Sequence, residues 1–124
     1  MSDEFRHPHR SWPHKFRDAF RGLGWSLRTQ SSLHVHVVVA LLVVAAGFVC
    51  RLTETLWCLL VLCIALVLSL ELLNTALERL AKAVDRWHNP DLGAALDIGS
   101  AAVLVAALGA VVAGALILLP RIWA

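Results

Sequence analysis

The sequence predicts an all-α integral membrane protein, with an N-terminal amphipathic helix in the membrane interface followed by three transmembrane helices. The chain of 124 residues is 59% hydrophobic and only 16% charged, whereas soluble domains are about half apolar and about a quarter charged. A mean hydropathy of +0.72 agrees with this excess. The length allows one domain and leaves no room for a separate soluble catalytic module. Any activity must therefore be built on or beside the membrane helices.

The N-terminal part divides into a tail and a surface helix. Residues 1–13 are predicted to form a mobile basic tail, and residues 14–124 one integral membrane domain. Over about 15–28, apolar residues recur at three- and four-residue spacing and line one helical face: Phe16, Phe20, Leu23 and Leu27. Such a helix lies flat in the interface, with its aromatic rings in lipid and its basic side chains among phosphates. Gly24 predicts a kink within it.

Three apolar runs follow, over about 35–50, 56–77 and 98–119. The third has 22 residues without a charge and reaches about 33 Å, enough to cross a hydrocarbon core of about 30 Å. The first two become long enough if each helix continues into its polar flank. A tight turn is predicted at 51–55, and a loop at 87–93, where Asn-Pro and Gly favour interruption of a helix.

The distribution of basic residues predicts the orientation in the membrane. The N-terminal segment and the second loop together carry nine: Arg6, Arg10, Lys15, Arg17, Arg21, Arg28, Arg79, Lys82 and Arg86. The opposite side carries two, Arg51 and Arg121. The positive-inside rule then places the N-terminus in the cytoplasm and the C-terminus outside. Beside apolar spans, a basic arm indicates anionic lipid headgroups as its partner, and no nucleic acid is expected.

Acidic side chains at the cytoplasmic end of the second span are the strongest functional signal. Glu71, Asn74 and Glu78 are spaced by three and then four residues, so a helix stacks them on one face. A carboxylate in hydrocarbon costs about 2.5–3.5 kcal/mol and needs a partner, a cation or water. Asp97 opens the third span and is expected to approach the same level, so that the acids surround one hollow. The alternative is that Glu71 and Glu78 only join helices or reach the interface.

Two carboxylates, an amide and a nearby aspartate suit a magnesium ion, with one acid left over as a base. The sequence has no Walker A run, which excludes the usual soluble phosphate-binding folds. His34 and His36 are two apart, diverge by about 200° on a helix, and are interpreted as interfacial residues. The cysteines form no C-x-x-C pair and are interpreted as small apolar residues within or beside the spans.

At these positions the chain resembles the bacterial diacylglycerol kinase and undecaprenol kinase family, over about residues 14–119. The most specific match is Glu71-Leu-Leu-Asn74-Thr-Ala-Leu-Glu78, followed by Asp97-Ile-Gly-Ser-Ala-Ala-Val-Leu. The resemblance implies a small homotrimer in the bacterial inner membrane, with three spans per subunit. It implies transfer of the γ-phosphoryl group of ATP, carried with Mg²⁺, to a membrane lipid hydroxyl. The sequence does not distinguish diacylglycerol from undecaprenol as the acceptor, because each presents a primary hydroxyl at the interface and the rest of each molecule is a hydrophobic tail.

The resemblance also implies roles for individual residues. Glu71 would be the general base and would contact the lipid hydroxyl, and Glu78 would bind magnesium and the nucleotide. Asn74 and Asp97 would support the nucleotide, and Ser100 would lie near the lipid. Each role is an expectation carried over from the family's motif.

Three positions depart from the family pattern. Gln30 replaces a glutamate that shares the metal with Glu78, and it offers a carbonyl oxygen without charge. Leu96 replaces a lysine that neutralises phosphate, and Lys82 replaces an aspartate. One hypothesis is that Lys82 supplies the missing positive charge from a shifted position. The alternative function is a catalytically weak homologue that acts as a membrane interaction or assembly subunit.

Overall fold

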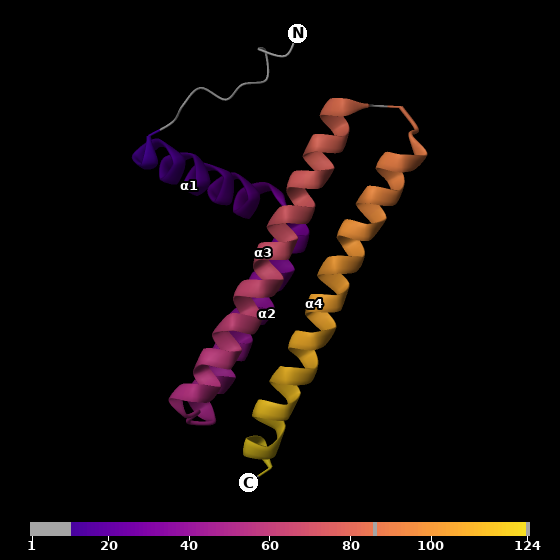
Figure 1. Ribbon diagram of the computed structural model, residues 1–124. Helices are drawn as coiled ribbons and strands as arrows, with labels where there is room; N and C mark the ends of the chain where they lie inside the picture. Colours follow the sequence, from indigo (N-terminus) through magenta and orange to yellow (C-terminus); the bar gives the residue numbers. More distant parts are fainter. Residues whose placement is uncertain (1–10, 86, 124) are drawn as a thin grey trace.

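The computed structural model describes residues 11–85 and 87–123, which form four α-helices. These are α1 (Trp12–Thr29), α2 (Ser31–Val49), α3 (Glu54–Val84) and α4 (Pro90–Ile122). Figure 1 shows α2, α3 and α4 running along one another, whereas α1 leaves this bundle at a steep angle. The predicted tail at 1–13 lies outside the described residues up to residue 10, and its last two residues already belong to α1.

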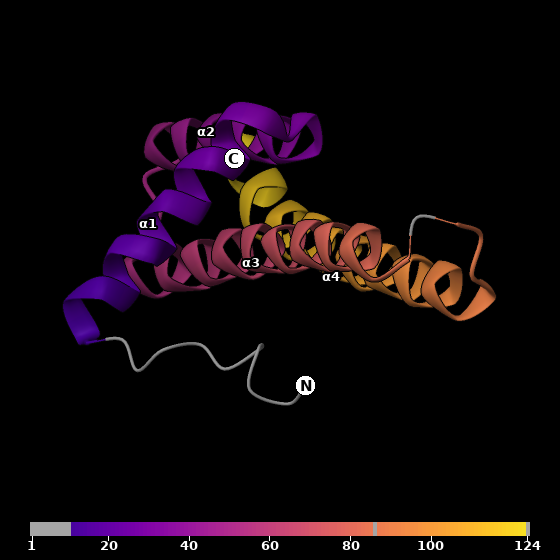
Figure 2. The same cartoon turned by 90° about the horizontal axis from the view of Figure 1, so that it is seen from above.

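Helix α1 continues through Gly24, where the sequence predicts a kink, without a break in its helical assignment. The chain breaks instead at Gln30, whose extended backbone ends α1 and begins α2. The break is stabilised on both sides, because the Gln30 N–H donates to the Ser26 carbonyl and the Gln30 carbonyl accepts from His34 N–H. An aromatic contact also anchors α1, since the Arg79 guanidinium of α3 lies 5.0 Å from the centre of the Trp25 ring. Figure 2 shows how α1 lies across the bundle.

A tight turn joins α2 to α3, as the sequence predicts. Arg51 has a φ of 53°, the left-handed conformation that costs an L-residue about 1–2 kcal/mol. The Thr53 hydroxyl then accepts from the Leu56 N–H and caps α3. The helices approach closely beside the turn, where a Cβ on Gly47 would meet the Trp57 ring at 2.7 Å.

The second connection is shorter than predicted. Residues Asp91 to Gly93 were expected in the loop, but α4 already begins at Pro90. The side chain of Asn89 accepts from the N–H groups of Asp91 at 3.0 Å and Leu92 at 3.3 Å. An Asn-Pro pair therefore starts this helix, with asparagine as the N-cap and proline in the first turn, where its missing N–H has no cost.

The three long helices are apolar enough to cross a membrane. They extend beyond the predicted apolar runs, since α2 begins at Ser31 and α3 continues to Val84. Helix α4 packs along α3, and α2 packs mainly against α3. A small cluster around Leu52, Leu60 and Ile117 forms the core near the α2–α3 turn. Most other large apolar side chains on these helices are exposed, as expected where lipid is the surrounding solvent.

Candidate active site

The polar stripe of α3 faces protein, as its spacing predicts. Glu71 is 5% exposed, Asn74 8% and Thr75 5%, although each lies on a helix whose other faces are largely exposed. The Thr75 hydroxyl donates to the Glu71 carbonyl at 3.0 Å and so is satisfied within the helix. Burying these groups is costly unless they are paired. The groups that contact Glu71 and Asn74 therefore indicate which chemical roles these two side chains can take.

Two side chains of α2 lie beside the two carboxylate oxygens of Glu71. The Ser32 hydroxyl donates a hydrogen bond to Oε1, and His36 Nε2 lies 3.6 Å from Oε2. Ser32 and His36 are four residues apart and therefore share one face of α2. The carboxylate thus lies between α2 and α3, deep along the helix rather than at its end.

Asn74 connects the stripe to the other acid. Its Nδ2 donates to Glu78 Oε1 at 3.1 Å, whereas its buried Oδ1 has no hydrogen-bond partner. Helix α4 approaches at Gly99, where a Cβ would come within 2.5 Å of that Oδ1. An unsatisfied buried carbonyl oxygen costs about 1–3 kcal/mol. The Asn74 carbonyl oxygen is therefore buried against α4 without a partner, and the amide nitrogen is the atom that faces Glu78.

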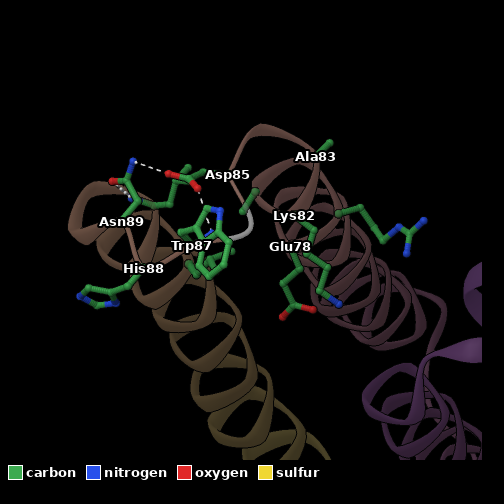
Figure 3. A pocket seen from close by; sticks show the side chains of 12 residues that line it. Glu78, Lys82, Ala83, Asp85, Trp87, His88 and Asn89 are labelled. Carbon is green, nitrogen blue, oxygen red and sulfur yellow. Dashed lines mark hydrogen bonds between the residues drawn. The ribbon is translucent and has the colours of Figure 1, made fainter.

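A hollow of about 890 Å³ opens between the ends of α3 and α4. Glu78 and Lys82 extend into it from α3, and Trp87, His88 and Asn89 come from the connection and the start of α4 (Figure 3). Its size lies within the range of about 300–1,000 Å³ typical of ligand sites. The hollow carries two acids, two cations and an amide beside an indole ring, and such a set suits a charged ligand with a flat apolar part: Glu78, Asp85, Arg79, Lys82, Asn89 and Trp87.

The three acids do not surround one hollow as the sequence predicted. Of the three, only Glu78 lines the space between α3 and α4. Glu71 lies two turns away, about 10 Å along the helix. Asp97 is exposed, because Gly99 faces α3 and a residue two positions earlier points about 200° away on a helix. Leu96, three before Gly99, lines the hollow instead.

The other predicted site residues lie apart from this hollow. Gln30 is at the junction of α1 and α2, where its Nε2 donates to Thr29 Oγ1 at 3.5 Å, and it does not line the hollow with Glu78. Ser100 is exposed on α4. Within the described ranges, no three His, Cys, Asp or Glu side chains gather as a metal cluster. Of the two acids that line the hollow, Asp85 accepts from the Trp87 N–H and from Asn89 Nδ2. A metal here would therefore have Glu78 as its acidic ligand and would need further oxygens from a bound phosphate.

Sequence reasoning missed Ser32 and assigned His36 to the interface. The two histidines diverge as expected, since His34 bonds to the Leu27 carbonyl while His36 reaches Glu71. The signal for Ser32 and His36 was their four-residue spacing, which matches a helix face. This spacing alone does not identify Glu71, 35 residues after His36, as their partner.

The three long apolar helices, with Glu71 buried between α2 and α3 and a charged hollow at one end, define an integral membrane protein. The chain belongs to the prokaryotic diacylglycerol kinase family, whose model matches residues 17–118. It is 36% identical over 107 residues to an undecaprenol kinase of Bacillus subtilis, covering 86% of this chain and 87% of that protein. It is 35% identical over 106 residues to a diacylglycerol kinase of Synechocystis, covering 85% of this chain and 61% of that longer protein.

Proposed function

We propose that this membrane kinase transfers the γ-phosphoryl group of MgATP to the hydroxyl of a membrane lipid alcohol. The observation that carries the proposal is that α3, in a chain of this family, places its two glutamates at different depths along the bundle. Glu71 is buried beside α2, whereas Glu78 lies in the open hollow about two turns away. The deep carboxylate is suited to act on a lipid, and the shallow one to hold a nucleotide that enters from water.

The hollow supplies groups for a nucleotide. Magnesium is usually bound by one or two carboxylates together with substrate phosphates. Glu78 fits this requirement as the carboxylate ligand on α3. Asn74 is proposed to support the nucleotide through Glu78, to which its Nδ2 donates, because its Oδ1 is buried against α4 at Gly99. The bound ion would neutralise charge on the phosphates. Gln30 would join this ligand set with its carbonyl oxygen only by a movement of the α1–α2 junction.

Lys82 is the cation proposed to contact the phosphates. It lines the same hollow as Leu96, the position where the family pattern has a lysine. A cation on α3 can therefore reach the space that a lysine on α4 would occupy. Charge stabilisation and positioning provide most of the catalysis in phosphoryl transfer. The departure at Leu96 is thus compatible with activity.

The lipid is proposed to enter from the apolar side. A groove of about 530 Å³ runs between α2, α3 and α4, with His36 among its lining residues. A lipid tail in this groove would bring its hydroxyl toward Glu71, which contacts His36. Glu71 would then accept the hydroxyl proton as the oxygen attacks phosphorus. Ser100 does not line this groove and is exposed on α4. Its proposed place near the lipid therefore requires lipid on the outer side of α4 as well.

The proposal also includes the membrane in which the chain lies and its orientation there. Trp12, Phe16 and Phe20 of α1 are exposed, which suits a helix lying in the membrane interface. The basic residues favour a cytoplasmic N-terminus in the bacterial inner membrane. The hollow then faces cytoplasmic ATP, because it is at the end of α3 that carries Lys82.

A homotrimer is proposed because one subunit leaves part of the predicted site facing outward. Asp97 and Ser100 are exposed on α4 and point away from the hollow. Asp97 can support a nucleotide only if another surface, such as a second subunit, lies beside it. A polar residue at a transmembrane level also requires such a neighbour.

The test is a transfer assay with purified protein in detergent, labelled ATP, magnesium, and either diacylglycerol or undecaprenol. The proposal expects one labelled lipid, with the productive acceptor identifying the substrate, and its loss in Glu71→Gln. A Glu54→Gln variant is the matched control, since Glu54 lies at the opposite end of α3. Absence of product from both lipids, with protein that unfolds cooperatively, would contradict the proposal.

A further inference from the structure

The carboxylate of Glu71 is held from one side by two groups of α2. Ser32 Oγ donates to Oε1, and His36 Nε2 lies 3.6 Å from Oε2. The His36 side chain is itself only 25% exposed. The Ser32 hydrogen bond restricts rotation of the carboxylate about its last bond, and the His36 ring lies beside the other oxygen.

This arrangement is specific to His36 rather than common to histidines near the membrane surface. His34, two residues earlier, turns to the Leu27 carbonyl of α1. His36 turns toward α3 and also lines the apolar groove between the three spans. The imidazole therefore lies between the buried acid and the space proposed for the lipid tail.

Burial alone does not explain the pair. A carboxylate that is nine-tenths buried needs hydrogen-bond donors, and donors to an ionised oxygen form stronger bonds than those to a neutral one. The Ser32 hydroxyl already supplies one donor. The second contact, at 3.6 Å, is too long for a hydrogen bond. Catalytic contacts of this kind are often long without substrate and shorten when substrate is bound.

We propose that His36 is a positioning residue for Glu71, and that its Nε2–H, together with Ser32, aims one carboxylate lone pair at the lipid hydroxyl. The inference rests on the proposed role of Glu71 as general base. In the step, the lipid oxygen forms a bond to the γ-phosphorus and the bond from that phosphorus to the bridging oxygen breaks. ADP keeps the electron pair, and the hydroxyl proton passes to Glu71.

A positioning role and a simple tie between helices predict different kinetics. Loss of a tie between α2 and α3 lowers stability and disturbs both substrates. Loss of positioning leaves the fold and the binding of MgATP intact but misplaces the base. A misplacement of about 1 Å can lower the rate of an oriented reaction by about 10²-fold.

The experiment compares His36→Ala, His36→Gln and the matched control His34→Ala in the full-length protein. The measurements are kcat, KM for MgATP and for the lipid in mixed micelles, and the melting temperature. We expect His36→Ala to lower kcat by about 10- to 100-fold with both KM values within about twofold. His36→Gln should restore kcat to within about threefold, because the amide Nε2 also donates. His34→Ala should keep the wild-type kcat.

Glu71→Gln, measured in parallel, separates two kinds of failure. If it retains kcat, the assignment of Glu71 as the base is wrong and the inference fails with it. If Glu71→Gln is inactive while His36→Ala keeps full kcat, only the inference about His36 is overturned. Equal losses of kcat in His36→Ala and His36→Gln would also overturn it, because the ring and not its donor would then be required.

Discussion

Replacing Gly99 by alanine places a methyl group where α4 meets the polar stripe of α3. The new Cβ would lie 2.5 Å from Asn74 Oδ1 and 3.1 Å from Leu77 Cδ1. Contacts this short force a neighbour to move, and the Asn74 amide is the group that can rotate. Its Nδ2 donates to Glu78, so rotation breaks the bond that orients this acid in the hollow.

The expected magnitude follows from two alternative costs. If Asn74 stays in place, compression costs about 1–3 kcal/mol. If it moves, a hydrogen bond to a charged acceptor is lost, at about 1.5–3 kcal/mol. Alanine stabilises a helix by about 1 kcal/mol relative to glycine, and this gain offsets part of either cost. The net loss in the free energy of unfolding is therefore about 0–2 kcal/mol if Asn74 stays in place and about 0.5–2 kcal/mol if it moves. Displacement of Glu78 should also raise KM for MgATP by about three- to tenfold.

The assay is thermal unfolding in detergent together with steady-state kinetics, using Gly109→Ala as the matched control. Gly109 lies on the same helix with nothing within 4 Å of its would-be Cβ, so alanine there should be neutral or stabilising by up to about 1 kcal/mol. The reasoning is refuted if Gly99→Ala melts at or above Gly109→Ala and keeps the wild-type KM for MgATP.

Three further predictions concern the hollow and the elements that hold it. Lys82→Ala should raise KM for MgATP by about tenfold, because a charged contact to phosphate is lost; Lys82→Arg should largely restore it, and an unchanged KM would remove Lys82 from the site. Asn89→Ala should lower the free energy of unfolding by about 1 kcal/mol through loss of the α4 cap, whereas Asn89→Ser should not; equal melting temperatures would contradict this. Trp25→Ala should destabilise the protein by about 0.5–1 kcal/mol, since it removes the contact with Arg79, and Trp25→Phe should lose less; equal losses in the two variants would argue against the ring–cation contact.

The fold was largely predictable because its signals are local. Long apolar runs identify the three spans, and the three- and four-residue spacing of Glu71, Asn74 and Glu78 places them on one helical face. The error at the second connection concerns a signal with two structural meanings. Asn89-Pro90 was interpreted as a loop, although the same pair is also a helix start. Gly24 lowers helix propensity, and α1 nevertheless continues through it to Thr29.

The site was less predictable because it depends on which helix faces meet. The spacing of Ser32 and His36 contains no information about Glu71, and only the packing of α2 against α3 joins them. Asp97 was expected near the other acids because of its position at the start of the third span. The close approach of Gly99 to Asn74 fixes the rotation of α4 and turns Asp97 outward.

The proposed division of α3 is tested most directly by MgATP binding in the two glutamate variants. The measurement is the rise in melting temperature that saturating MgATP produces in Glu71→Gln and in Glu78→Gln, since a ligand that binds the folded state raises its stability. The account predicts that Glu71→Gln keeps the full rise although it transfers no phosphoryl group, and that Glu78→Gln loses most of it. A full rise in Glu78→Gln, or its loss in Glu71→Gln, would contradict the assignment of the nucleotide to the hollow and of the chemistry to the buried acid.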